Sequence, residues 1–594
     1  MSVLLAIATL NREHFVLSDK LRKTQRAAAK KETMSVDQLA AVTVKSHDGL
    51  FEVDAGSRLD ATVDAVDSWI FEAVDGPLNG PSPPDLAVAS IMNMRRFGGQ
   101  RAHFDLWQQA LWEDWRLGRH EEQWVFIPGD WDMAALQDAW LHRKESNFMG
   151  YVWIDQSTWP LMQPAMRRSK QLSLTVIGVE QRAGKRRRLV VGRPPITHMS
   201  AYAIAQAGLE GTYVNAFLTR ALPKYADLSC ALLLRAWHVL SDLTKVLAAE
   251  RSRPTFTDFT NVRQWALVVR RSELVETLAR ALSVSDGVAT QAIDFLSWSK
   301  GTYKGLWGAP FVPLPGQSDQ LAIAASVLTH SNLVRTVEIW MTKGGLDDQL
   351  SKGSKGRSFE AELRADVREE LKGNAVVRDT ACAEHAVKKG PDFPEEIDLL
   401  VRFGTILLVG EVKCFLYPAD SRERFNFLRN LRGACDQASR KAIAIGQRMD
   451  VAARALGISE ADAQLLQVVP IVVLNQGYGM SLVSGNCVVT DAKFLKLYLG
   501  SATYTSEGAV NVADGGMATT TRSLYRDAAE AVTNFESTMR SPPPLHRFRS
   551  LLRWTSFAFP TTSGGALQIA QTELGQLPDA TRKLYETMKA AVEA

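Results

Sequence analysis

Residues 396–413 have the sequence Glu396-Ile-Asp-Leu-Leu-Val-Arg-Phe-Gly-Thr-Ile-Leu-Leu-Val-Gly-Glu-Val-Lys413, and this stretch decides which fold the chain can adopt. It contains two apolar runs on either side of a turn that we expect at Phe403-Gly404. The second run, 406–412, is almost entirely apolar, as in a strand that is buried on both faces. The stretch therefore predicts a β-hairpin in the interior of a sheet.

Two charged residues stand at the end of the second apolar run. Glu411 and Lys413 are two residues apart, so their side chains lie on one face of the strand. An unpaired charge is costly to bury, so charges at the end of a buried strand need a partner or a function. The bare Glu-x-Lys pattern is common, and the alternative is an exposed hairpin with an ordinary ion pair.

Asp398 belongs to the same face if the hairpin has the expected register. A two-residue loop at Phe403-Gly404 sets Asp398 opposite Val409, and paired residues share a face of the sheet. Asp398 then lies diagonal to Glu411, within reach of one cation. A register slipped by one residue would move Asp398 to the other face.

Two carboxylates and an ammonium in this arrangement suit metal-assisted hydrolysis of a phosphodiester. Mg²⁺ prefers oxygen ligands, keeps several waters and also binds substrate phosphate. A bound metal acidifies a water and stabilises charge on the phosphodiester. We expect Asp398 and Glu411 to hold Mg²⁺, for which Mn²⁺ would substitute, with the Val412 carbonyl as a further ligand. Lys413 would orient or deprotonate the attacking water.

These residues resemble the PD-(D/E)XK nuclease superfamily, whose pattern is matched by Asp398 followed by Glu411-Val-Lys413. The resemblance covers about residues 350–480. It implies a restriction-endonuclease-like mixed sheet flanked by helices. A literal Pro391-Asp392 lies upstream, but proline fits poorly inside a central strand, so Asp398 is assigned as the motif aspartate. Because inactive relatives keep the fold, the resemblance leaves catalytic activity open.

The family often has a glutamate on the helix before these strands, and residues 358–371 predict that helix, with Ser358 as N-cap. Its expected buried face repeats every four residues: Phe359, Leu363, Val367 and Leu371. Glu360 falls beside this face and Glu362 falls on the far side, so Glu360 is the candidate. Many members also have a glutamine or lysine on the helix that follows the lysine strand, and Gln437 could fill that place.

The composition describes an ordinary globular protein. The chain has 594 residues, of which 46% are hydrophobic and 23% charged, with a net charge of +4. Five scattered cysteines without a Cys-x-x-Cys pair indicate reduced thiols and a cytoplasmic location. No apolar run of 18 residues occurs, so we expect no membrane span.

The length allows several domains. We expect an α+β region rich in tryptophan at 1–160, and a basic hairpin with a helical domain at 161–345. The nuclease domain at 350–500 and a C-terminal helical extension at 501–594 would follow. The predicted class is therefore a multidomain protein with α+β and α/β parts.

Basic residues form two candidate contacts with nucleic acid, because clustered Lys and Arg bind phosphates. One is the tip of a hairpin formed by Lys185, Arg186, Arg187 and Arg188. The other is Arg429 and Arg432, on the helix that follows the lysine strand. The alternative for the hairpin is a merely soluble loop tip.

The sequence thus predicts a metal-dependent nuclease, an endonuclease acting on double-stranded DNA. By analogy of fold alone, a large accessory region also fits antiphage defence or restriction. One alternative is a catalytically silent nucleic-acid-binding or scaffold protein that keeps the fold. Another is structure-specific processing in repair or recombination. A homo-oligomer or a partner protein stays open, and no phosphate-binding loop of an ATP motor is present.

Overall fold

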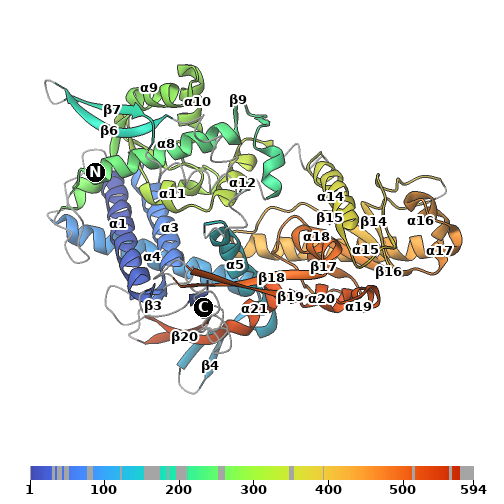
Figure 1. The fold of residues 1–594 in the computed structure, drawn as a ribbon. Helices are drawn as coiled ribbons and strands as arrows, with labels where there is room; N and C mark the ends of the chain where they lie inside the picture. Colours follow the sequence, from blue (N-terminus) through green and yellow to red (C-terminus); the bar gives the residue numbers. More distant parts are fainter. Residues whose placement is uncertain are drawn as a thin grey trace, which may run out of the picture. The chain divides into compact units, whose positions relative to one another are not determined.

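Helices and short strands follow one another throughout the chain in the computed structural model (Figure 1). The structure describes most residues of the chain, in these ranges: 2–29, 34–35, 43–45, 52–75, 85–120, 123–152, 174–182, 186–194, 209, 212–251, 261–346, 354–391, 393–511, 516–560 and 565–574. The mixture of helices with several small sheets confirms a mixed α and β protein with more than one structural unit. In these ranges no helix combines the length and the apolar character needed to cross a membrane.

The chain divides into two units that are not consecutive in sequence. Unit 1 contains residues 1–31, 41–106 and 150–348, whereas unit 2 contains 32–40, 107–149 and 349–594. This division differs from the four consecutive domains expected from the sequence. The segment 107–149 of the tryptophan-rich region belongs to the unit that carries the hairpin at 396–413.

Unit 1 is built from helices and small antiparallel sheets. Its elements are α1 (Ser2–Ala29), β2 (Thr43–Lys45), β3 (Glu52–Asp54), α3 (Ala55–Ala73), the first part of α4 (Leu86–Trp112), β6 (Thr175–Arg182), β7 (Arg186–Gly192), η2 (Tyr213–Phe217), β8 (Ala221–Leu222), β9 (Tyr225–Ser229), α8 (Cys230–Ala249), η3 (Val262–Trp265), β10 (Val268–Arg270), α9 (Arg271–Leu282), α10 (Asp286–Phe295), η4 (Gly305–Trp307), β11 (Phe311–Leu314), β12 (Gln317–Ile323), α11 (Ala325–His330) and α12 (Leu333–Lys343). The expected basic hairpin is present as β6–β7.

The region that the sequence suggests is helical, up to residue 345, also contains a sheet. Strands β10, β12 and β11 lie in that order and are antiparallel to one another. Buried Asn11 ties α1 to this sheet, because its Nδ2 donates to the carbonyls of Trp265 at 2.9 Å and Ile323 at 2.8 Å. The short apolar runs of β10 and β11 are compatible with either helix or strand by periodicity alone, and these long-range pairings select the strand.

Unit 2 contains the candidate nuclease region. Its elements are β1 (Met34–Ser35), the end of α4, β4 (Trp115–His120), β5 (Gln123–Pro128), α5 (Trp131–Val152), α14 (Ser354–Gly373), β13 (Thr380–Cys382), β14 (Leu399–Phe403), β15 (Ile406–Lys413), α15 (Ser421–Gln447), α16 (Met449–Leu456), α17 (Glu460–Gln464), β16 (Gln467–Leu474), β17 (Val488–Asp491), α18 (Ala492–Gly500), β18 (Thr503–Asn511), β19 (Gly516–Ser523), α19 (Ala528–Thr533), α20 (Phe535–Arg540), α21 (Pro543–Leu551), β20 (Leu552–Pro560) and β21 (Ala566–Leu574).

The central sheet of unit 2 has five strands in the order β13-β14-β15-β16-β17. The first three strands are antiparallel to their neighbours, and β15, β16 and β17 are parallel. The connection from β15 to β16 passes through α15, α16 and α17, as a parallel crossover requires. Strand β15 is buried along its length until Lys413.

The β14–β15 hairpin forms as expected, but its register differs from the predicted one by two residues. Phe403 pairs with Ile406, so the turn is Gly404-Thr405 and not Phe403-Gly404. Gly404 has φ +61° at the first central position, where a type II′ turn favours glycine. Phe403 stays in the ladder because its fully buried ring packs near Tyr498 at a centroid distance of 6.2 Å. A shift of two residues keeps every side chain on its predicted face.

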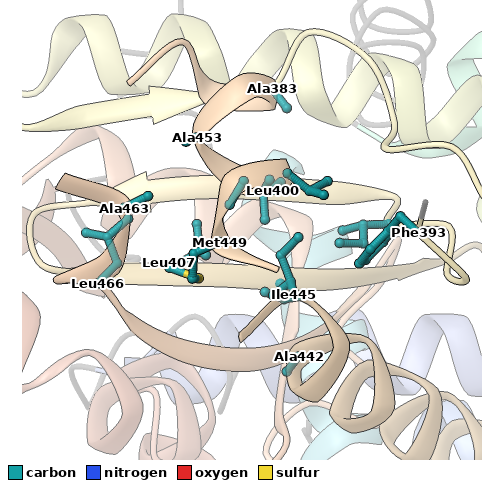
Figure 2. Close-up of a cluster of buried hydrophobic side chains, with 14 residues drawn as sticks. Ala383, Phe393, Leu400, Leu407, Ala442, Ile445, Met449, Ala453, Ala463 and Leu466 are labelled. Carbon is teal, nitrogen blue, oxygen red and sulfur yellow. The ribbon is translucent and has the colours of Figure 1, made fainter. Parts of the chain in front are cut away.

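One face of this sheet is covered by the helices that connect β15 to β16. Leu400, Leu407 and Val409 form a buried cluster with Ile445 of α15 and Met449 of α16. Figure 2 shows these apolar side chains between the strands and the helices. By alternation, Asp398, Glu411 and Lys413 belong to this same face, beyond the end of the apolar cluster. The polar residues thus lie where the apolar contact between α15 and the sheet ends.

Helix α14 has the predicted buried face but begins earlier than expected. Phe359, Leu363, Val367 and Leu371 are all buried. Ser358 is not the N-cap, because the helix already begins at Ser354. Lys355 and Arg357 are good helix formers, and serine is tolerated inside a helix at a small cost in stability. The helix therefore extends through Ser358 to an earlier start.

The described part of 501–594 is not purely helical, in contrast to the helical extension expected there. It contains the antiparallel hairpins β18–β19 and β20–β21 as well as the short helices α19, α20 and α21. The β-branched threonines at 503, 505 and 519–521 favour strands, which explains the β18–β19 hairpin in a segment expected to be helical. Residues 575–594, at the end of the expected helical extension, lie outside the described residues.

Candidate active site on the β14–β15 hairpin

The structure brings Asp398, Glu411 and Lys413 together at the open end of the hairpin. Because Leu399 pairs with Gly410, the next positions along the ladder are Asp398 and Glu411, directly opposite each other. Asp398 lies in the bend just before β14 and not inside the strand as predicted. Both carboxylates are buried, with exposed fractions of 8% for Asp398 and 4% for Glu411.

Each carboxylate has identifiable partners. The Val412 N–H donates to Asp398 Oδ2 at 3.0 Å, which fixes the orientation of this carboxylate at the end of the ladder. Lys413 Nζ donates to Glu411 Oε1. A second ammonium, Lys441 Nζ of α15, donates to Glu411 Oε2 and lies 3.6 Å from Asp398 Oδ1. The two buried carboxylates are therefore held by two lysines.

Lys441 is the site residue that the sequence reasoning missed. Gln437 was assigned to the helix position in the site, but Lys441 lies one turn later on the same side of α15. Lys441 is buried, whereas Gln437 is half-buried. The usable signal was a lysine in phase with the apolar residues Ala434, Ala438 and Ile445, on the face that packs on the sheet.

Helix α14 contributes the polar residues beside the two carboxylates. Glu360 is half-buried and Glu362 is exposed, as the helical phase predicts. Buried Arg364, one turn after Glu360, donates from Nη1 to the Asp398 carbonyl at 2.5 Å. This bond anchors the backbone at the start of β14 to α14, so Glu360 is held near the hairpin end.

The electrostatics of the site disfavour further negative charge. Burial raises the pKa of Asp398 to about 6, and the Glu411 carboxylate acts in the same direction, although Lys441 opposes it. Partial burial also raises the pKa of Glu360, against the effect of Arg364, with Glu411 raising it further. Below about pH 6 the protonated form of Asp398 would compete with any cation for its oxygens.

The donors of this site fit a hard divalent cation only in part. Asp398 and Glu411 present oxygens, which Mg²⁺ prefers, and Mg²⁺ sites often have only one or two carboxylates. The described residues contain no group of three or more His, Cys, Asp or Glu side chains placed to hold a metal ion. Waters, a backbone carbonyl and substrate phosphate would have to complete the coordination. The two carboxylates therefore supply only part of the oxygen ligands of such an ion.

The predicted basic residues fall in both units. Arg429 and Arg432 are exposed on α15 of unit 2, and in the described part of the chain no carboxylate lies within ion-pair distance of either. In the β6–β7 hairpin of unit 1, Arg188 Nη2 is 3.2 Å from Glu276 Oε1. Lys185 lies outside the described residues, as do the side chains of Arg186 and Arg187.

Aromatic side chains accompany the arginines near the start of α15. Phe425 is 37% exposed, and its ring centroid lies 5.3 Å from that of Trp112, at the end of α4. Arg422 and Arg429 lie over these two rings, at 5.9 Å from Trp112 and 6.0 Å from Phe425. Exposed arginines interleaved with aromatic rings are a surface to which phosphates and bases can bind.

Comparisons with known proteins add no relative to this description. No protein-family model, no curated protein and no solved structure matches the chain.

Proposed function

We propose that this chain is a divalent-metal-dependent nuclease with a restriction-endonuclease-like domain in unit 2. The observation that carries the proposal is the placement of Asp398 and Glu411 opposite each other at the end of a buried hairpin, beside Lys413. Two carboxylates buried this close together cost stability unless cations or hydrogen-bond donors offset their charge, and a metal-binding site requires such a pair. The mixed sheet order and the helices beside it support the same domain type.

Each residue has a defined task in this proposal. Asp398 and Glu411 would hold Mg²⁺, which supplies an acidified water and neutralises charge on the phosphodiester. The N–H of Val412 points to Asp398, and in a strand the carbonyl of the same residue points to the same side. The Val412 carbonyl would therefore serve as the third protein ligand of the metal. Lys413, whose side chain is 27% exposed, would orient the attacking water or take its proton.

The exposed arginines of α15 indicate the class of substrate. Arg429 lies twelve residues before Lys441, which is about 18 Å along a helix. That distance corresponds to about five base pairs of duplex from the site. A nucleic-acid strand whose phosphate lies at Lys413 would therefore extend over Arg429 and Arg432. We infer a polymeric nucleic acid, with duplex DNA as the expected substrate.

Incubation of the purified full chain with supercoiled plasmid tests the proposal. We expect nicked and linear products with Mg²⁺, reduced to background by EDTA. A plasmid that stays supercoiled with both Mg²⁺ and Mn²⁺, while the protein still binds DNA, would favour the silent nucleic-acid-binding alternative. The specific observation favouring that alternative is that the two ammoniums already neutralise the two carboxylates.

Two glutamates two residues apart provide a matched test of the site. Glu360→Gln should lower the cleavage rate about tenfold or more, because Glu360 is half-buried beside Glu411 and misplacing a reacting water is costly. Glu362→Gln removes the same charge from the exposed side of α14 and should leave the rate unchanged. Rates measured at several Mg²⁺ concentrations separate weakened metal affinity from slower chemistry. The reverse ranking would exclude α14 from the site.

Exchange of arginines on α15 tests the substrate path. Replacing Arg429 and Arg432 by glutamine should weaken duplex binding and lower the slope of log K against log salt by about 2. Arg526→Gln is the control, because Arg526 is an exposed arginine paired with Glu530. The double variant Arg186→Gln/Arg187→Gln tests in the same way whether the β6–β7 hairpin of unit 1 contributes to duplex binding. An unchanged slope after both double exchanges would remove both surfaces from the substrate path.

A further inference from the structure

Lys441 lies where a cation between the two carboxylates would be. Its Nζ donates to Glu411 Oε2, is 3.6 Å from Asp398 Oδ1, and has a side chain only 8% exposed. We propose that the Lys441 ammonium is an internal counterion that a divalent ion must displace, so that metal binding depends on nucleic acid being bound. This proposal rests on the proposed function and adds a regulation of the same site.

The ammonium and the metal ion cannot occupy this place together. Mg²⁺ bound by Asp398 and Glu411 would lie 2.0–2.1 Å from their oxygens. These are the oxygens that Lys441 Nζ approaches, so an ion there would be a few ångströms from a like charge in a buried site. The repulsion is large at low dielectric. The four-carbon side chain of Lys441 must therefore swing away when the ion binds.

The charges around the site explain why bound nucleic acid would favour metal binding. The site and its immediate surroundings have three carboxylates, Asp398, Glu411 and Glu360, and three cations, Lys413, Lys441 and Arg364. A fourth carboxylate that acts on Glu360, Glu396, is balanced by its own ion pair with Lys388 at 2.8 Å. The group is already neutral without any metal. Replacing the Lys441 ammonium by a divalent ion gives this buried neutral group a net positive charge, which is unfavourable unless an anion arrives as well. The phosphates of a nucleic acid supply that anion, and they give the displaced ammonium of Lys441 a new partner.

Lys441 is assigned this role because of its contacts. Among the two carboxylates Asp398 and Glu411, the Lys413 ammonium forms its ion pair with Glu411. Its side chain is more exposed than that of Lys441, so Lys413 can turn to substrate without leaving both carboxylates. Arg364 binds a backbone carbonyl and does not stand between the carboxylates. The Lys441 ammonium bridges the Asp398 and Glu411 carboxylates, so its displacement frees both carboxylates for the metal ion. Binding coupling is reciprocal, so the metal must tighten nucleic-acid binding by the factor by which nucleic acid tightens metal binding.

Direct metal titration tests the displacement. Free Mn²⁺ is followed by electron paramagnetic resonance as it is added to the full chain without nucleic acid. We expect Lys441→Met to bind Mn²⁺ at least about tenfold more tightly than the unmodified protein, because the competing ammonium is gone. The control Lys496→Met removes a lysine that pairs with Asp366 at 2.6 Å, away from the site, and should leave the affinity unchanged. Equal or weaker Mn²⁺ binding by Lys441→Met would overturn the proposal.

The unmodified protein provides a second test that does not depend on the variant folding. Adding a 16-base-pair duplex should tighten Mn²⁺ binding about tenfold or more, after subtraction of the same titration with Asp398→Asn protein. Lys441→Met should reduce this enhancement to less than about threefold. Tight Mn²⁺ binding to the free unmodified protein with no enhancement by duplex would overturn the coupling while leaving the nuclease proposal intact. Failure of the nuclease proposal differs, because Asp398→Asn would then change neither Mn²⁺ binding nor plasmid cleavage.

Discussion

Plasmid cleavage should fall by about three orders of magnitude or more when Glu411 is replaced by glutamine, because the metal contribution to such reactions is several kcal/mol. Glu411 is buried, and its two oxygens are the partners of Lys413 and Lys441. The amide cannot neutralise a divalent ion. It also leaves Lys413 without its carboxylate and Lys441 with Asp398 as its remaining carboxylate partner. The rate of plasmid nicking at saturating Mg²⁺ is the measurement.

Lys413→Met should cause a loss of similar size for a different reason, since the attacking water loses its orienting group. The side chain of Lys413 is partly exposed, so this variant should remain folded, which circular dichroism can verify. Lys496→Met is the matched control and should cleave normally. Full cleavage by folded Lys413→Met protein would remove the proposed mechanism, even if Glu411→Gln were inactive.

The free energy of unfolding of unit 2 should fall by about 3–5 kcal/mol when Glu113 is replaced by alanine. Glu113 forms an ion pair with Arg424 of α15, and the exposed fractions of the two side chains are 5% and 16%. Alanine would leave the arginine buried without its carboxylate. Chemical denaturation followed by tryptophan fluorescence measures the loss.

Two further variants separate this ion pair from a general effect of mutation. Glu113→Leu combined with Arg424→Met removes both charges and should recover most of the lost stability. Glu530→Ala breaks the exposed pair with Arg526 and should have little effect. A Glu113→Ala protein as stable as Glu530→Ala would show that the Glu113–Arg424 ion pair does not stabilise unit 2.

Much of the candidate site could be predicted because side-chain alternation in a strand is a local property. The apolar run at 406–412 determined a buried strand, and the spacing of two residues placed Glu411 and Lys413 on one face. The phase of α14 likewise separated half-buried Glu360 from exposed Glu362. These inferences needed no knowledge of which elements pack together.

The hairpin register follows both from turn chemistry and from tertiary packing. A type I′ turn at Phe403-Gly404 would need a positive φ at Phe403, whereas Gly404-Thr405 places glycine at the first central position of a type II′ turn. Burial of Phe403 near Tyr498 and Tyr525, which come from distant parts of the chain, selects the second. The face of Asp398 was correct because the shift is even, but its direct position opposite Glu411 was not predicted.

The sequence by itself determined the elements whose pattern is local: the buried hairpin, the phase of α14 and the face that carries the acidic residues. Only the tertiary structure decided that Lys441 and not Gln437 reaches the carboxylates, because the choice depends on how α15 lies against β15. It also decided that residues 107–149 belong to the unit that carries the β14–β15 hairpin, through contacts such as Glu113 with Arg424 and Trp140 Nε1 with the Met480 carbonyl at 2.9 Å. Such contacts join residues more than 300 positions apart, and no periodicity within a short window encodes them.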